Sequence, residues 1–141
     1  MKKRSRLRSM RVSTGFRSFV LDQLAIVGDV TPKEMFGGIG LYSGGVFFGI
    51  LASDVLYLKV DETNRTDFER AGSKPFTPYA DRMGTMQYWS VPIGILESAP
   101  ELAAWTLKAI AVAERAREAQ ARPARAKAAR RSRRKVGLKR R

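Results

Sequence analysis

Apolar residues recur at helical spacing near the start of the chain. Five of them fall on one stripe of a single helix: Phe16, Phe19, Val20, Leu24 and Val27. Ser13 or Thr14 can cap the start of this helix, and Gly28 is suited to end it. The pattern therefore predicts an amphipathic first helix whose apolar stripe is buried in the core.

The next part of the chain, up to residue 60, has short apolar runs separated by Gly, Ser and Asp. This pattern is typical of an antiparallel meander, and three strands fit it, at residues 38–42, 46–51 and 55–60. Phe47 and Phe48 must point to opposite faces of their strand because side chains alternate along a strand. We expect one sheet face to meet the helices and the other to be partly exposed, which makes it a candidate partner surface.

Two short elements precede the last helix. Asn64 is suited to open a short helix that buries Phe68 and ends at Gly72, and an acidic residue in its first turn, Asp67, favours the helix dipole. Residues 85–91 then have the composition of another strand, because aromatic and β-branched residues dominate them.

The last helix has the clearest signals in the chain. Ser98 and Glu101 form a capping box with Pro100 in the first turn. The apolar stripe that follows consists of Leu102, Trp105, Ala109, Val112 and Ala113. We expect this helix to continue to about Gln120 and to be broken by Pro123, which lacks a backbone N–H.

Composition indicates one domain between two charged ends. The 141 residues, 44% of them hydrophobic, are enough for one real core, and the mixture of helices and antiparallel strands predicts the α+β class. We divide the chain into a basic extension at residues 1–12, a domain at residues 13–121 and a basic tail at residues 122–141. The tail is low in complexity and almost free of large apolar residues, so we expect it to be disordered in solution. Such a tail can become helical once phosphates neutralise its charge repulsion.

The formal net charge of +14 is concentrated at the two ends. Residues 1–12 hold 6 Lys/Arg and no acid, residues 13–114 hold 8 Lys/Arg against 12 Asp/Glu, and residues 115–141 hold 13 Lys/Arg against 1 Glu. These segments therefore carry +6, −4 and +12. Affinity for polyanions is expected in the ends of the chain rather than on the mildly acidic domain.

The residue types that are missing exclude much of enzyme chemistry. The sequence has no Cys and no His, so thiol nucleophiles, disulfides, Cys/His zinc sites and imidazole bases are absent from a single chain. Lys59 with Ser43 or Ser53 does not have the spacing of a nucleophilic pair, and the acidic residues do not have the spacing of a calcium loop. We therefore predict no catalytic site, no metal site and no cofactor.

The basic tail is the strongest chemical signal. Its 11 cationic residues are Arg122, Arg125, Lys127, Arg130, Arg131, Arg133, Arg134, Lys135, Lys139, Arg140 and Arg141. They predict sequence-independent binding to nucleic-acid phosphates, DNA and RNA being equally open, because no base-reading motif is present. A purely solubilising tail is the alternative. Binding to anionic membranes is a weaker alternative, because the tail lacks the aromatic anchors that interfacial segments use.

The start of the chain does not have the pattern of a secretion signal. The apolar stretch that follows the basic residues is interrupted by Asp22 and Gln23, and no run of about 18 apolar residues exists. We expect a cytoplasmic protein without a membrane span. Met10 is a candidate natural start, and an organelle transit peptide is a weaker interpretation of the Arg- and Ser-rich first residues.

A series of motifs resembles the N-terminal domain of the TfoX/Sxy family. Met35-Phe36-Gly37-Gly38 with Gly40-Leu41-Tyr42, and Leu56-Tyr57-Leu58-Lys59-Val60-Asp61, carry the resemblance first, followed by Phe68-Glu69 with Gly72, Pro75-Phe76 with Pro78-Tyr79, Tyr88-Trp89 with Val91-Pro92, and Leu102 with Trp105 and Ala109. The match covers about residues 13 to 118. Each motif is short, so the specificity comes from their order and spacing.

The resemblance implies a curved antiparallel sheet of about four to five strands flanked by helices, similar to secretion-chaperone-like domains. It also implies a non-enzymatic role in regulating competence and transcription, with a homodimer and a protein partner in transcription regulation as candidate partners. Full-length members add a helical C-terminal domain, and this sequence has a basic tail in that place. The motif residues that we single out for structure or partner binding are Met35, Phe36, Gly37, Gly38, Lys59, Tyr88, Trp89, Pro92 and Trp105.

Two functions from different classes follow. In the first, the protein is a regulatory or accessory protein whose basic tails hold nucleic acid. In the second, it is a protein-binding module with a chaperone-like fold, and its basic tails are incidental. An enzyme for a small anionic substrate is a third class, and it would need a well-formed cavity with convergent polar groups.

Overall fold

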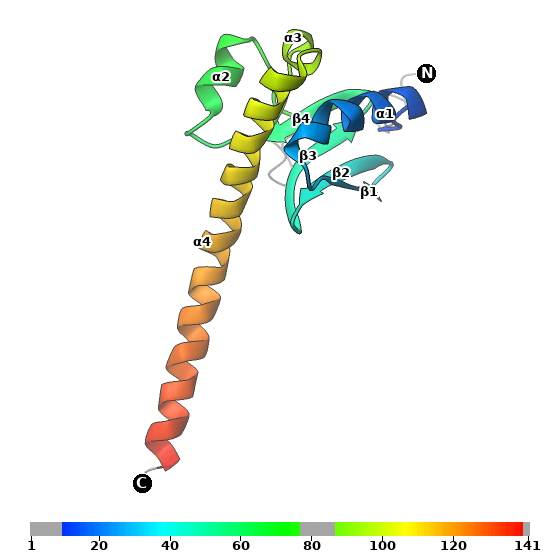
Figure 1. The fold of residues 1–141 in the computed structure, drawn as a ribbon. Helices are drawn as coiled ribbons and strands as arrows, with labels where there is room; N and C mark the ends of the chain where they lie inside the picture. The colour runs from blue at the N-terminus through cyan, green and yellow to red at the C-terminus, as the bar shows by residue number, and fades with distance from the viewer. Residues whose placement is uncertain (1–9, 77–86, 140–141) are drawn as a thin grey trace, which may run out of the picture.

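The computed structural model describes residues 10–76 and 87–139, leaving out the side chains at 123–127 and 132–139. A five-stranded antiparallel sheet in the order β1-β2-β3-β4-β5 has one face covered by α1, η2 and the first half of the long helix α4 (Figure 1). The elements are α1 (Thr14–Gln23), the 3₁₀ helix η2 (Leu24–Val27), β1 (Thr31–Met35), β2 (Gly38–Ser43), β3 (Val46–Ala52), β4 (Val55–Lys59), α2 (Arg65–Arg70), β5 (Tyr88–Ser90), α3 (Ile93–Leu96) and α4 (Ala99–Lys139). The predicted α+β fold is confirmed.

The first helix begins where the sequence predicts, but it is α-helical only to Gln23 and continues as the 3₁₀ helix η2 to the predicted end at Gly28. The Ser13 hydroxyl accepts a hydrogen bond from the backbone N–H of Phe16 at 3.1 Å, which caps α1, and Gly28 ends η2 with a φ of 100°. Val20 and Leu24 are buried as expected. Phe19 differs from the prediction, since 40% of its surface is exposed.

The predicted meander corresponds to β2, β3 and β4, but the sequence reasoning missed β1. Pro32 and two charged residues hide the strand pattern of β1. Pro32 is tolerated because β1 forms the edge of the sheet and needs hydrogen bonds on one side only. The register of β2 against β3 shifts between Leu41 and Tyr42, which leaves Phe48 without a paired partner and turns it into the core.

The second half of the sheet also follows the prediction in part. The short helix is α2, with Phe68 buried at its centre, and the strand predicted at 85–91 is present as β5. Residues 77–86 lie outside the described part of the chain. The segment before them pairs with β5, since the N–H of Phe76 donates to the carbonyl of Tyr88 at 2.7 Å. The short helix α3 was not predicted.

The last helix is longer than the sequence predicts. The Ser98 hydroxyl caps α4 by accepting from the N–H of Glu101, as expected. The predicted end near Gln120 is wrong, because α4 continues through Pro123 to Lys139 and includes most of the tail that we expected to be disordered. Proline removes a single hydrogen bond of the helix, whereas the surrounding Ala and Arg residues have high helix propensity. Among the described residues, no helix has both the length and the apolar character needed to cross a membrane.

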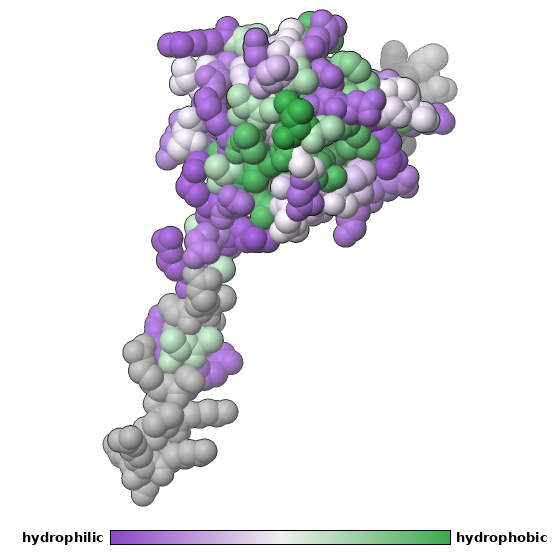
Figure 2. All heavy atoms as spheres, viewed as in Figure 1, coloured by the Kyte–Doolittle hydropathy of each residue, from purple (hydrophilic) through white to green (hydrophobic). Residues whose placement is uncertain are grey.

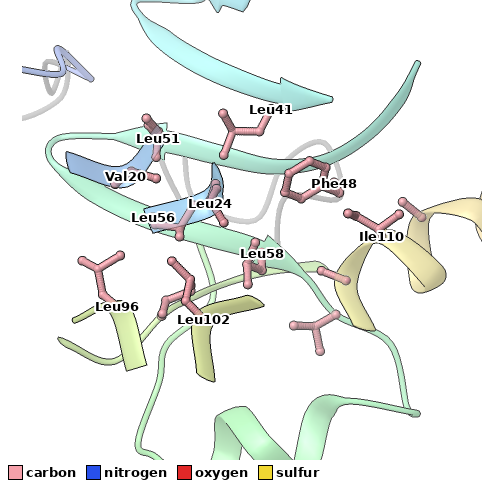
Figure 3. Packing of buried hydrophobic residues seen from close by; sticks show 14 of the residues in the cluster. Val20, Leu24, Leu41, Phe48, Leu51, Leu56, Leu58, Leu96, Leu102 and Ile110 are labelled. Atoms are coloured by element: carbon pink, nitrogen blue, oxygen red, sulfur yellow. The ribbon is translucent and has the colours of Figure 1, made fainter. Parts of the chain in front are cut away.

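The main core lies between the sheet and the helices. Figure 3 shows side chains from all layers meeting there, including Val20 and Leu24 from α1 and η2, Phe48 from β3 and Leu102 and Ile110 from α4. Phe68 lies at the end of this core, beside the two tryptophans. The centroid of its ring is 4.6 Å from that of Trp105 and 6.5 Å from that of Trp89. Burial of these large side chains supplies most of the driving force for folding.

The opposite sheet face carries a smaller apolar cluster. Phe76 and Tyr88 are buried there, and Phe47, Ile50 and Tyr57 are half-buried. This arrangement confirms that Phe47 and Phe48 point to opposite faces. It also shows that this face is partly covered by the segment that ends at Phe76.

A close approach at Gly38 predicts a large cost for a side chain there. A Cβ atom on Gly38 would lie 2.7 Å from the backbone oxygen of Leu51, so the neighbouring strand must move. We expect Gly38→Ala to lower the free energy of unfolding by about 1–3 kcal/mol in urea denaturation. Gly94→Ala is the matched control, since its Cβ meets nothing within 4 Å, and it is expected to be neutral or slightly stabilising. Equal effects of the two substitutions would contradict this explanation.

Thr106 provides a second test of the core. Its hydroxyl is fully buried in α4 and has no hydrogen-bond partner among the described residues. We expect Thr106→Val to leave the free energy of unfolding unchanged or to raise it by about 1 kcal/mol, because the substitution removes an unpaired buried hydroxyl. Ser98→Ala should instead destabilise by about 1 kcal/mol, because that hydroxyl caps α4.

Candidate functional site

The cationic residues predicted to bind nucleic acid lie on the second half of α4. That half projects away from the sheet (Figure 1), and the described side chains of Arg122, Arg130 and Arg131 are exposed. Arg125, Lys127, Arg133, Arg134, Lys135 and Lys139 belong to the same helix, whereas Arg140 and Arg141 lie outside the described residues. From residue 122 to residue 139 the helix advances about 26 Å, at the usual rise per residue. The cationic residues are therefore spread along a single straight element.

A polar hollow of about 400 Å³ lies where α4 leaves the domain. Cations line it from three elements: Lys59 at the end of β4, Arg65 at the start of α2, and Arg115 on α4. The carboxylates of Asp61 and Glu62 lie among them. The hollow is open and its charges are mixed, which is unlike the closed apolar pocket of a typical small-molecule enzyme.

Arg115 is held by the loop between β4 and α2. Its Nη2 donates to the hydroxyl of Thr63 at 2.9 Å and lies 3.4 Å from a carboxylate oxygen of Asp61. Burial raises the pKa of Asp61, but hydrogen bonds from Thr63 and the charge of Arg115 outweigh this effect, so the pKa lies below its ordinary value. The ionised carboxylate thus fixes the first exposed arginine of α4 on the domain.

Lys59 lies on the other side of the hollow. Its Nζ donates to the side-chain oxygen of Gln87 at 3.1 Å and lies 4.9 Å from the ring centroid of Tyr88. Burial lowers the pKa of Lys59, and the nearby Asp61 opposes that change. Burial raises the pKa of Tyr88 to about 12, with a further contribution from Tyr42, so the phenol stays neutral at physiological pH.

The motif residues separate into three groups. Lys59 lines the hollow, and its Nζ lies 4.9 Å from the ring centroid of Tyr88. Trp89 and Trp105 pack against Phe68, and Pro92 occupies the N-cap position of α3. The group Met35, Phe36, Gly37 and Gly38 forms the turn between β1 and β2 on another part of the molecule. The family motifs therefore do not converge on one site.

The sequence did not single out Arg65, Gln87 and Arg115, which line the hollow. Gln87 and Arg115 are single polar residues without a motif around them, so nothing in the sequence marks them. Asn64 is 2% exposed, and its side chain does not cap α2 as expected. Instead it accepts from the N–H of Asp61 at 2.8 Å and donates to the carbonyl of Lys59 at 3.1 Å, which fixes the loop beside the hollow.

The polar groups of the hollow are engaged with one another. Among the residues that the structure describes, no three His, Cys, Asp or Glu side chains gather as metal ligands. The Asp61 carboxylate accepts from the Thr63 hydroxyl at 2.6 Å and lies 3.4 Å from Arg115, so it is engaged within the hollow's own network.

Comparison with known protein families decides the relationship of the chain. The model of the TfoX N-terminal domain matches residues 22–113. The chain belongs to this family. The TfoX N-terminal domain is a regulatory domain without known catalysis that is linked to competence regulation. The match covers the sheet and the packed half of α4 and ends before the basic half. No curated protein matches the chain.

The lowered pKa of Asp61 predicts an acid-sensitive contribution to the stability of this TfoX N-terminal domain. Because folding favours the ionised carboxylate, its contribution is present above the ordinary pKa of 3.8 and is lost as the pH falls through the lower pKa of the folded state. We expect Asp61→Asn to remove this part of the pH dependence of the thermal midpoint. Glu62→Gln, an exposed neighbour outside the hydrogen-bond network, should leave the acid limb of the curve in place. An unchanged acid limb in Asp61→Asn would refute the assignment.

Proposed function

We propose that this TfoX N-terminal-domain protein is a cytoplasmic regulatory or accessory protein that binds nucleic-acid phosphates through the basic half of α4. The observation that carries the proposal is the continuity of α4. Its first half is part of the core, and the same helix presents exposed cations such as Arg122 and Arg130 beyond the domain. A protein partner in transcription regulation would then bind the domain.

The physical basis of the proposed binding is the release of counterions. Each cation that meets a phosphate releases condensed salt ions, so the affinity falls steeply with ionic strength. Alanines alternate with the cations along residues 121–131, and such small side chains allow a phosphate backbone to approach the helix closely. Phosphate contacts fix the position of a protein without reading bases, so the proposal is for binding that is insensitive to sequence.

The polar hollow continues the line of cations from α4 onto the domain. Arg115 lies seven residues before Arg122 on α4, which is close to two helical turns, so the two side chains lie on the same side of the helix. Lys59 and Arg65 line the hollow beside Arg115. A nucleic-acid strand that follows this side of α4 would therefore meet three cations of the domain, beside the acids Asp61 and Glu62.

The alternative function is a protein-binding module whose basic residues are incidental. One observation favours it: apolar side chains gather over η2 where it lies between α1 and α4 (Figure 2). Ile26 on η2 is 62% exposed, and Leu107 on α4 is 55% exposed. Exposed apolar residues of this size are common at protein interfaces.

The experiment that tests the proposal is a salt titration of binding to labelled random duplex DNA and single-stranded RNA. The variant replaces Arg130, Arg131, Arg133 and Arg134 by Gln in the full chain. A matched control replaces Lys2, Lys3, Arg4 and Arg6 by Gln, which removes the same charge from the other end. We expect the α4 variant to reduce the slope of log affinity against log salt by about 3–4, and the control to change it little.

The outcomes separate the two functions. Equal losses in the two variants would mean that overall charge, not α4, determines the affinity. Failure of the wild-type chain to bind either nucleic acid at low salt would refute the proposal and leave the protein-binding module.

A further inference from the structure

The turn between β1 and β2 contains an aromatic residue in an unfavourable place. Met35 pairs with Gly38, and the two residues between them have positive φ angles, 47° at Phe36 and 83° at Gly37. Turns of this kind favour Asn and Gly, and a bulky residue in the left-handed region costs about 1–2 kcal/mol. Phe36 is also 87% exposed. Neither burial nor turn geometry therefore explains a phenylalanine at this position.

A hollow of about 510 Å³ lies directly beside this turn. One wall comes from the start of α1 and includes Arg17, and the opposite wall comes from the hairpin and includes Glu34. Gly37 and Ile39 also line it. A Cβ atom at Gly37 would meet nothing within 4 Å, so the backbone is accessible there. The hollow thus offers open space bordered by charges of opposite sign.

We propose that this surface, defined by Phe36, Arg17, Glu34 and the hollow between them, joins two copies of the chain about a twofold axis. The Phe36 ring of each copy enters the hollow of the other, and Arg17 of each copy faces Glu34 of the other. A second copy is the occupant because a twofold interface must be complementary to itself. This one surface carries an apolar projection, a recess beside it and both signs of charge.

The proposed contact between the two copies is not made by pairing of their edge strands. The two-residue turn makes Met35 and Gly38 a hydrogen-bonded pair, so Lys33 and Thr31 also point their backbone groups toward β2. The outward backbone groups of β1 then belong to Pro32 and Glu34, and proline has no N–H to donate. Because one of the two outward donors is missing, β1 is a poor template for a further strand, and side chains must make the interface.

The position of this surface leaves α4 accessible. The β1–β2 turn lies beside the start of α1, on the side of the molecule away from α4 (Figure 1). A dimer joined at Phe36 would therefore carry two basic helices that extend from opposite sides. The dimer itself does not depend on nucleic-acid binding, so the two proposals can fail separately.

The first experiment is sedimentation velocity of the full chain over a series of concentrations. We expect wild type to form a dimer and Phe36→Asn to weaken it by about tenfold or more, as loss of an aromatic anchor does. At concentrations at which both proteins are monomeric, the thermal midpoint of Phe36→Asn should be equal or higher, because Asn tolerates the left-handed conformation. Ile93→Asn is the matched control, since Ile93 is 68% exposed on α3, away from this surface, and it should leave the dimer intact. A monomeric wild type, or equal dimerisation of Phe36→Asn, would overturn the proposal.

The second experiment tests the arrangement of charges. Arg17→Glu places two acids at each contact and Glu34→Arg places two cations there, so each variant alone should be monomeric. A mixture of the two variants restores opposite charges at both contacts, and we expect a heterodimer to form. A contact within one chain cannot produce this result. Failure of the mixture to associate, or dimers of either variant alone at wild-type strength, would refute the twofold arrangement.

Discussion

The packing of α4 against the sheet is the interaction on which the rest of the structure depends. Leu102, Ala109 and Ile110 belong to the same core cluster as the strands, so the helix cannot shift without opening the core. Two polar contacts fix it further: Lys108 pairs with Asp67 of α2 at 2.9 Å, and Arg115 with the loop at Asp61. These exposed pairs add little energy, but they determine where the helix lies when it leaves the domain.

Much of this fold is predictable from local patterns. Strong periodicity and capping residues locate α1, β2 to β4, α2 and the start of α4, because these elements bury one face each. The errors have physical causes. β1 escapes prediction since an edge strand with Pro32 has little apolar alternation, and the end of α4 is misplaced since the helix propensity of Ala and Arg exceeds the local effect of Pro123.

The candidate sites are less predictable than the fold. The cationic residues of α4 are evident from composition alone. In contrast, the hollow joins Lys59, Gln87 and Arg115, which are far apart in the sequence and carry no common motif. The exposed aromatic at Phe36 is part of a recognisable motif, yet its strain and its exposure become visible only with the backbone angles and the surface in hand.

An uninterrupted α4 also determines the angular position of its charges. Each residue of a helix turns the next side chain by about 100°, so the direction of Arg122 and Arg130 relative to the sheet is set by the number of residues between them and the core. The side chains of the basic half therefore have a fixed orientation relative to the domain. Any molecule held on one side of this helix is presented to a fixed side of the domain.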